Sequence, residues 1–318
     1  MEIYETQAEI AKTKNWLLSL VVLVLVTFGV LVLLQGVALA LIPLIFDISI
    51  DGLLGLMTGG ATDIPNGRMA LYFVQGVGSG IGFIVAAWII IKFIEKAFLN
   101  LPLQVSRFNA QGFLIVLLIT LGGMLFNAFL VDLNSKLVLP EFLSGLELWM
   151  REMEDQLMEM TKFLTDFQST GEFIVGLVVI GLLAGIGEEV FFRGLVQPKF
   201  HQYTGSAHWG VWITAIIFSA IHVQFYGFLP RMFLGAMFGY LYLYSGSLVY
   251  PIIAHIFNNA FTVVMVYLAN QGKVDFDLES ADSISYPVSF AGFLVLLVGI
   301  YYFKKTNQSQ NGELDQGL

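Results

Sequence analysis

The sequence contains no cysteine among its 318 residues. Disulfides, thiolate metal sites and cysteine nucleophiles are therefore all excluded. Charge is also scarce, because Asp, Glu, Lys and Arg together make up 12% of the chain, whereas a soluble domain carries about 25%. The net charge of -9 argues against nucleic acid as a partner.

Hydrophobic residues are abundant instead, at 57% of the chain, and they fall in blocks separated by short polar stretches. A transmembrane helix needs roughly 20 apolar residues to cross ~30 Å of hydrocarbon. Eight such blocks are present, at about 16–45, 70–92, 112–132, 173–196, 207–228, 229–248, 250–270 and 286–303. The first block is too long for the core of a cleavable signal peptide and is interpreted as a retained span. The sequence therefore predicts an all-α, polytopic transmembrane helical bundle in contact with the lipid bilayer.

The distribution of Lys and Arg predicts how the bundle is oriented. With the N-terminus inside, the inner segments hold eight of these residues and the outer segments six. Because positive charge accumulates on the cytoplasmic side, we expect both termini to be inside. In a bacterial cell the membrane would be the cytoplasmic one.

The longest polar segment, 133–172, carries a helical pattern of its own. Ser144 followed by Glu147 fits a capping box, and apolar residues recur at helical spacing through 144–168, with acidic residues between them. This pattern predicts an amphipathic extramembrane helix that rests on the bundle or on the membrane surface, or that covers a substrate entrance. The tail after Lys305 is rich in Asn, Gln and Gly, and we expect it to be disordered.

The first polar motif inside a predicted span is GEEVFFR at 187–193, placed at the end of the fourth span. Ionisable groups inside spans are costly and usually functional. Glu189 precedes Arg193 by four residues, the favourable orientation for an ion pair on one helix face. Glu188 has no such partner, and a carboxylate in an apolar site suits a general base near neutral pH. Alternatively, both carboxylates lie at the water interface and are only solvated.

Two further motifs lie on later spans. Phe218 and His222 share one face of the fifth span, where a histidine can also be a hydrogen-bonded core residue. His255 and Asn259 are four residues apart on the seventh span and project side by side. These two side chains can donate to an oxyanion, bind a metal, or join helices as a polar patch.

The ordered trio Glu-Glu-x-x-x-Arg, Phe-x-x-x-His and His-x-x-x-Asn resembles the CPBP family. That family comprises the type II CAAX prenyl proteases, the bacteriocin-processing and immunity-associated (Abi-like) proteases and their relatives. The resemblance covers about 173–270, and its motif positions are Glu188, Glu189, Arg193, Phe218, His222, His255 and Asn259. It implies an intramembrane endopeptidase that cleaves a membrane-associated or lipid-modified protein or peptide.

No Ser-His-Asp arrangement is evident, so a water activated by a carboxylate remains as the nucleophile. Our hypothesis assigns this water to Glu188 and His222. His255 and Asn259 would donate to the oxyanion. The supporting residues would be Glu189, Arg193 and Phe218, of which the first two hold the helix and its charge in place.

Three alternatives remain open. A zinc ion held by Glu188, His222 and His255 would leave one open position, as catalytic zinc sites do. We favour a site without a cofactor, because there is no His-Glu-x-x-His and Asn259 is an indifferent zinc ligand. A non-catalytic membrane scaffold or an ion-coupled transporter would also use buried polar groups, although no inverted repeat is evident. The sequence does not specify the oligomeric state or the cleavage site.

The expected organisation is 1–172 for three spans and the acidic amphipathic helix, 173–270 for the catalytic core, and 271–318 for the last span and tail. This organisation contains a conflict. Glu188 and His255 lie toward the cytoplasmic side, whereas His222 lies ~10 Å deeper at ~1.5 Å per residue. The groups can meet only if the fifth span is tilted or sunk, or if the boundaries differ by a turn or more.

Overall fold

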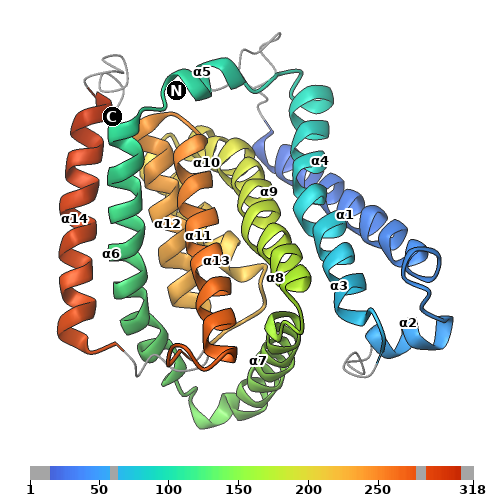
Figure 1. Ribbon diagram of the computed structural model, residues 1–318. Coiled ribbons are helices and arrows are strands. Elements are labelled where there is room, and N and C mark those ends of the chain that lie inside the picture. The colour runs from blue at the N-terminus through green and yellow to red at the C-terminus, as the bar shows by residue number, and fades with distance from the viewer. Residues whose placement is uncertain (1–14, 58–63, 277–283, 309–318) are drawn as a thin grey trace.

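The computed structural model describes residues 15–57, 64–276 and 284–308, and helices account for nearly all of these ranges (Figure 1). The helices of the first half are α1 (Trp16–Phe46), α2 (Ile50–Met57), α3 (Gly67–Gln75), α4 (Gly82–Ile89), α5 (Leu101–Ser106) and α6 (Ala110–Ser135). They are followed by α7 (Ser144–Thr165), α8 (Thr170–Gly176), α9 (Ala184–Phe191), α10 (Gln197–Thr204), α11 (Ala207–Ala220), α12 (Phe228–Ser245), α13 (Val249–Asn270) and α14 (Tyr286–Gln308). The all-α prediction is confirmed.

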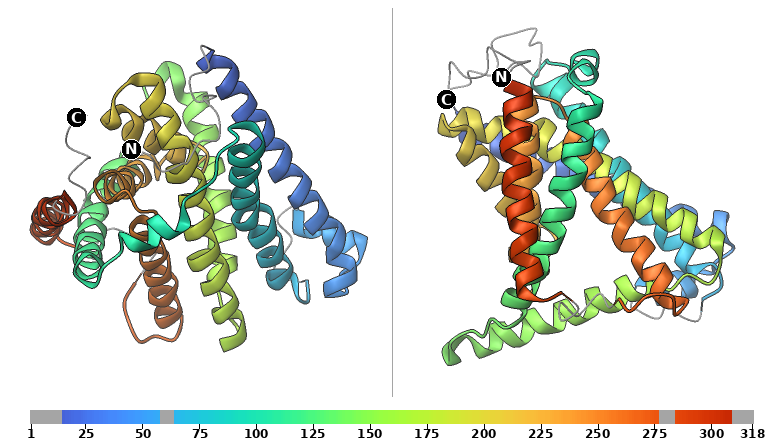
Figure 2. Two further views of the ribbon diagram at one scale, coloured as in Figure 1. Left: turned by 90° about the horizontal axis from the view of Figure 1, so that it is seen from above. Right: turned by 60° about the vertical axis from the view of Figure 1, so that its left-hand side comes forward.

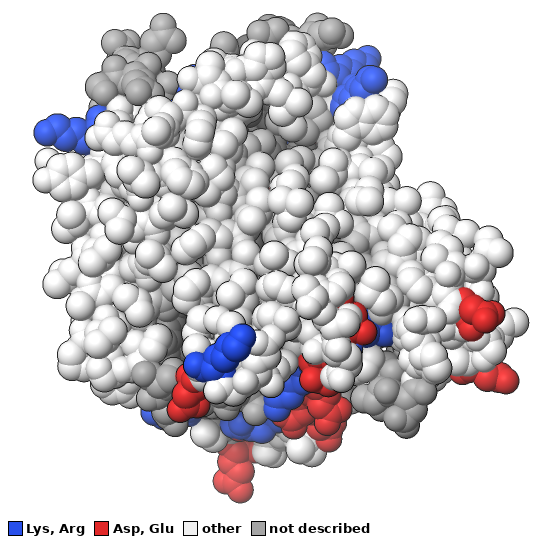
Figure 3. All heavy atoms as spheres, viewed as in Figure 1, with Lys and Arg blue, Asp and Glu red and all other residues white. Residues whose placement is uncertain are grey.

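Six helical stretches among the described residues are long and apolar enough to cross a membrane. They are Trp16–Phe46, Gly67–Ile94, Ala110–Ser135, Thr170–Thr204, Val249–Asn270 and Tyr286–Asn307. Charged side chains gather toward the two ends of the face in Figure 3 and leave a band without charged residues between them. The protein is therefore an integral membrane protein built as a polytopic helical bundle.

The predicted fifth and sixth spans do not meet the same criteria, so the count of eight is not confirmed. Helix α11 is apolar but only 14 residues long, which gives ~21 Å at ~1.5 Å per residue and falls short of the ~30 Å hydrocarbon. Helix α12 is 18 residues long and is also not among the six. These two helices pack against each other as a short hairpin.

The fourth span is longer than the sequence pattern predicted. It runs as one helical stretch from Thr170 to Thr204 instead of 173–196. Two π-helical segments, η6 (Leu177–Leu183) and η7 (Phe192–Val196), flank α9 within it, and such wide turns are frequent at functional sites. The GEEVFFR motif consequently lies near the middle of this stretch, not at its end.

Small residues set how closely the helices approach around α9. A side chain at Gly187 would overlap the carbonyl oxygen of Gly80, in the π-helical segment η3 (Gly76–Ile81), and one at Gly185 would lie 2.8 Å from Cγ1 of Ile256 on α13. The stretch that carries the acidic pair is thus pressed between the second and seventh predicted spans. Glycine permits this backbone approach in lipid.

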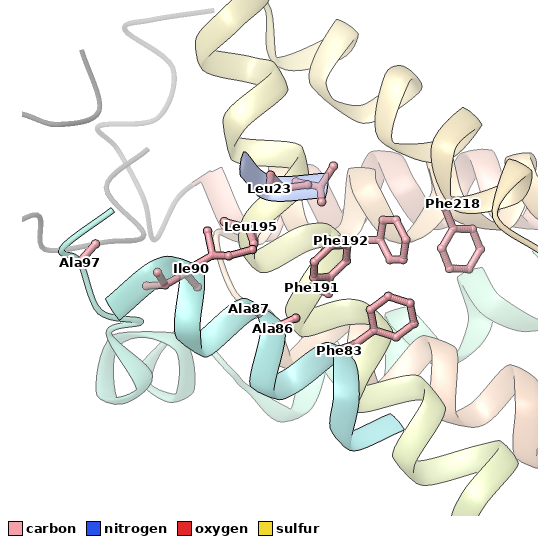
Figure 4. Packing of buried hydrophobic residues seen from close by; sticks show 12 residues of the cluster. Leu23, Phe83, Ala86, Ala87, Ile90, Ala97, Phe191, Phe192, Leu195 and Phe218 are labelled. Atoms are coloured by element: carbon pink, nitrogen blue, oxygen red, sulfur yellow. The ribbon is translucent and has the colours of Figure 1, made fainter. Parts of the chain in front are cut away.

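Aromatic packing fills the space beside this crossing. Phe83 of α4 lies 5.0 Å from Phe191 and 5.8 Å from Phe192, between ring centroids. Phe192 in turn meets the edge of Phe218 from α11 at 5.2 Å. Figure 4 shows these four rings together, joining the N-terminal helices to the motif-bearing ones. Such ring pairs prefer tilted or edge-to-face geometry.

Helix α7 is the predicted amphipathic helix, and it begins at Ser144 and ends at Thr165. It lies across the end of the bundle opposite α5 and α10, nearly perpendicular to α6 and α14 (Figures 1 and 2). The expected capping box does not form, because Glu147 accepts hydrogen bonds from Leu139 N, at 2.8 Å, and from Arg151. The expected disordered tail lies mostly outside the described residues, and α14 continues to Gln308.

Candidate active site

Glu189 is the centre of a buried polar cluster on α9. Its carboxylate is 0% exposed, and one oxygen, Oε1, accepts hydrogen bonds from Arg193 Nη1 at 2.6 Å and from His255 Nδ1 at 2.7 Å. The predicted ion pair with Arg193 is present. A single carboxylate oxygen therefore joins the α9 motif to the motif of α13.

Arg193 is also fully buried and is held on several sides. Its Nη2 donates to the carbonyl of Gly235 on α12 at 2.8 Å. Its guanidinium lies 4.8 Å from the ring centroid of Phe218 and 5.5 Å from that of Phe238. Since a buried charge is tolerated only when paired and hydrogen-bonded, these contacts account for a cation inside the bundle.

His255 lies between the two adjacent glutamates. Its Nδ1 contacts Glu189, while its Nε2 lies 3.9 Å from Oε2 of Glu188. An ionised carboxylate can only accept, so the Nδ1–H of His255 donates to Glu189 and the Nε2 edge is turned toward Glu188. The ring of Phe238 stacks on His255 at 4.8 Å, which fixes the plane of the imidazole.

Glu188 differs from its neighbour in exposure and in partners. Its side chain is 15% exposed against 0% for Glu189. Among the described residues its nearest ionisable contact is the 3.9 Å approach to His255, which is longer than a hydrogen bond. This carboxylate is therefore accessible, and its oxygens are free to bind a water molecule or a substrate group.

His222 lies immediately beyond the C-terminal end of α11 and is half-buried. Its Nδ1 lies 2.7 Å from the carbonyl of Phe218, which leaves Nε2 as the free ring nitrogen. The rings of His222 and His255 both face the ring of Phe218, with centroid distances of 5.1 and 6.0 Å. His222 is also within electrostatic range of Glu188 and of His255.

Asn259 is near the cluster but is engaged elsewhere. Its Nδ2 donates to the carbonyl of Ile180, in η6, at 3.0 Å, and its Oδ1 accepts from Asn258 at 3.1 Å. The expected pairing of His255 and Asn259 on one helix face holds. One of the two Nδ2 hydrogens is nevertheless committed to the neighbouring helix, which leaves a single donor for other groups.

The positional conflict in the sequence interpretation is removed by the boundaries. Glu188 lies near the middle of its helical stretch, and α11 ends at Ala220 instead of 228. His222 therefore meets the level of Glu188 and His255, and the three motifs converge on one region.

The donors suggested for zinc do not gather into a ligand set. Within the ranges 15–57, 64–276 and 284–308, no group of three or more His, Asp or Glu side chains is arranged to hold a metal ion. His255 uses Nδ1 for Glu189, and His222 uses Nδ1 for a backbone carbonyl. These three side chains therefore do not form a zinc site in the arrangement described.

Two residues near the site were missed or misread in the sequence. Phe238 carries no polar group to draw attention, and only its stacking on His255 reveals its place. Arg231 lies in no motif of the sequence, yet it is half-buried, donates to the side-chain oxygen of Gln224 and lies within electrostatic range of Glu188. His201 and His208 lie outside the cluster, and Nδ1 of His208 is 3.0 Å from the hydroxyl of Tyr240.

Comparison with known proteins finds a family match over the region that carries this site. Residues 170–261 match the family described as "Type II CAAX prenyl endopeptidase Rce1-like". The chain is also 33% identical over 100 residues to an "Uncharacterized 24.3 kDa protein" of Escherichia coli. That alignment covers 30% of this chain and 46% of the relative, so the chain spans less than half of that relative's length.

No solved structure matches the chain. The matched range contains Glu188, Glu189, Arg193, Phe218, His222, His255 and Asn259. Residues 170–261 therefore form a region that is similar to the Rce1-like group of the CPBP, or CAAX protease, family.

Proposed function

We propose that the protein is an intramembrane endopeptidase that hydrolyses a peptide bond of a membrane-associated or lipid-modified substrate with a carboxylate-activated water. The observation that carries this proposal is the unequal environment of two adjacent glutamates. Glu189 is buried and its Oε1 is paired with Arg193 and His255, whereas Glu188 is accessible and faces two histidines. A site of this form has one structural carboxylate and one that is available for proton transfer.

In the proposed reaction Glu188, with His222, orients the water and removes its proton as the water oxygen bonds to the carbonyl carbon. The C–N bond then breaks as Glu188 returns that proton to the departing amine. Positioned acid–base groups of this kind typically contribute about 10²–10⁴ in rate. Arg193 and Glu189 do not touch the reacting atoms and instead hold α9 and His255 in place.

The developing oxyanion needs donors, and His255 and Asn259 are the proposed ones. Since Nδ1–H of His255 is used by Glu189, only a doubly protonated imidazole can offer its Nε2–H to the oxyanion. The remaining Nδ2 hydrogen of Asn259 would be the second donor, and such a donor is typically worth about 10²–10³ in rate.

The orientation with both termini inside remains part of the proposal. It would place α7 on the outer side. The proposed substrate is one that is already held in the membrane. The family description makes a lipid-modified C-terminal segment one such substrate. A leader or terminal peptide anchored at the bilayer is another.

The decisive experiment compares protein termini by mass spectrometry in membranes of cells that make the wild type, Glu188→Ala, or the surface control Glu159→Ala at matched levels. We expect new termini with the wild type and the control, and none with Glu188→Ala. Identical termini in all three samples, with all three folded, would contradict the peptidase proposal and favour the scaffold or the transporter.

The same cleavage, repeated with purified protein after exhaustive chelation, separates the two mechanisms. Full activity without added metal is expected for the carboxylate mechanism. Loss of activity that zinc restores would support the zinc-dependent alternative at Glu188, His222 and His255 instead.

A further inference from the structure

His222 is the second residue of a short connection, 221–227, that joins α11 to α12. Its backbone N–H still donates to the carbonyl of Ser219 at 3.2 Å, so the end of α11 fixes one side of the residue. The direction in which the chain leaves His222 depends on the residues that follow. The ring is held at Nδ1 by the carbonyl of Phe218, and contacts to the connection restrain the backbone on the other side of His222.

The next residue, Val223, has a strained backbone. Its φ angle is +55°, in the left-handed region, and it is the only β-branched residue among the described non-glycine residues with positive φ. A β-branched residue rarely adopts this conformation, and it persists only where the surroundings impose it. Because Val223 itself is 39% exposed, packing of its own side chain does not impose it.

One restraint on the connection comes from α6. Asn134 is 1% exposed, and its Nδ2 donates to the carbonyl of Phe225 at 2.9 Å. Its Oδ1 accepts from the backbone N–H of Leu229 at 2.7 Å. A single buried amide thus joins the end of the connection to the first turn of α12.

The other restraint comes from α7, outside the predicted spans. Glu154 accepts the backbone N–H of Tyr226 on Oε2 at 3.1 Å and Nε2 of Gln224 on Oε1 at 3.3 Å. The same helix places Trp149 against Phe225, with 5.3 Å between ring centroids. Helix α7 therefore contacts every residue from 224 to 226.

This contact continues toward the proposed site. The side-chain oxygen of Gln224 accepts from Arg231, whose guanidinium is within electrostatic range of both Glu154 and Glu188. His222 is in turn within electrostatic range of Arg231 and Glu188. Glu154 and Glu188, which belong to different helices, thus share one half-buried cation.

We propose that Glu154 is a positioning residue for His222. Together with Asn134, it holds 223–227 in the conformation that strains Val223 and directs the imidazole of His222 toward Glu188. Helix α7 is then part of the catalytic apparatus, because the site is assembled only while this helix is docked. The inference rests on the proposed role of His222 in handling the water.

The test compares Glu154→Ala with Glu159→Ala, an exposed glutamate on the same helix. Each protein is treated with diethylpyrocarbonate, and the labelling rate of each of the four histidines is measured by peptide mass spectrometry. In Glu154→Ala we expect faster labelling of His222 with unchanged labelling of His201, His208 and His255. Glu159→Ala should match the wild type at all four positions.

Turnover of a peptide that spans the cleavage site found in the terminus experiment gives the second readout. We expect Glu154→Ala to lower kcat about tenfold or more while KM stays nearly constant, since misplacing a catalytic group by ~1 Å can cost about 10²-fold. Adding Val223→Gly should recover part of that loss, because glycine adopts positive φ without strain. A merely structural role for Glu154 would not produce this recovery.

The outcomes separate the inference from the proposed function. Unchanged His222 labelling and unchanged kcat in Glu154→Ala would overturn the inference, whether or not Glu188→Ala is inactive. Faster His222 labelling with unchanged kcat would retain the positioning role and remove His222 from the mechanism. If all four histidines label faster, the Glu154→Ala variant has unfolded. Glu154→Gln, which keeps one accepting oxygen, then replaces it. For that variant we expect a smaller increase in labelling rate, at His222 alone.

Discussion

The same sequence relation, a glutamate followed four residues later by an arginine, occurs in two regions with opposite surroundings. In the bundle, Glu189 and Arg193 pair at 2.6 Å with both side chains 0% exposed. On α7, Glu147 and Arg151 pair at 2.7 Å with side chains 15% and 44% exposed. The helix spacing that favours the pair is identical, so the difference lies entirely in what surrounds it.

The comparison shows that burial changes what an ion pair does. The exposed pair is screened by water, and pairs of this kind are worth little. In the buried pair each partner removes the large penalty of leaving the other uncompensated, and both partners also bind a third group, His255 or Gly235. Spacing alone predicts the contact, whereas its importance depends on position in the bundle.

The sharpest way to test this comparison is to delete the arginine from each pair. We expect Arg193→Ala to destabilise the folded protein by about 3–5 kcal/mol, because it leaves Glu189 charged and buried. Arg151→Ala should change the stability by less than ~1 kcal/mol. Thermal unfolding in one detergent measures both, and equal effects would show that the environments do not differ as described.

Glycine-to-alanine changes extend the comparison from charge to packing. Gly187→Ala would place a methyl group on the carbonyl oxygen of Gly80, and overpacking of this kind typically costs about 1–3 kcal/mol. Gly145→Ala on α7 meets no atom within 4 Å and should be neutral or stabilise the helix by up to ~1 kcal/mol. If Gly187→Ala and Gly145→Ala lower the melting temperature by the same amount, the close crossing at Gly187 is contradicted.

The smallest expected effect concerns acid pH. The hydrogen bond from Arg151, followed by that from Leu139 N–H, holds the pKa of Glu147 below its usual range. Because the pKa of Glu147 is lower in the folded state than in the unfolded state, ionised Glu147 stabilises the fold at pH values above its unfolded-state pKa. That stability is lost as the pH falls through the folded-state pKa. The small difference in melting temperature between wild type and Glu147→Gln should therefore vanish on acidification. A difference that grows instead would contradict the lowered pKa of Glu147.

The fold class and the approximate helix positions followed from composition and hydropathy, because lipid requires helices with internally satisfied backbones. Helix ends did not follow. The polar residues at 187–193 lowered the hydropathy and suggested a span boundary, although the helical stretch continues to Thr204. Buried partners such as Gly235 and His255 keep those residues inside the bundle, and such partners are distant in the sequence.

For the site, short-range spacing predicted the Glu189–Arg193 pair, and the resemblance supplied the grouping of the three motifs. The long-range contacts could not be predicted from the sequence. Neither the stacking of Phe238 on His255 nor the link from Glu154 to Tyr226 has a local pattern. The roles of Glu188, His222, His255 and Asn259 remain predictions.

The contact between Gly80 and Gly187 also bears on how the chain is divided. The family match begins at 170, yet the surface against which α9 rests is contributed by a helical segment more than a hundred positions earlier in the sequence. In a fragment that starts at 170, the backbone at Gly187 would face lipid instead of Gly80. The stretch that matches the family is therefore smaller than the unit that packs together in this structure.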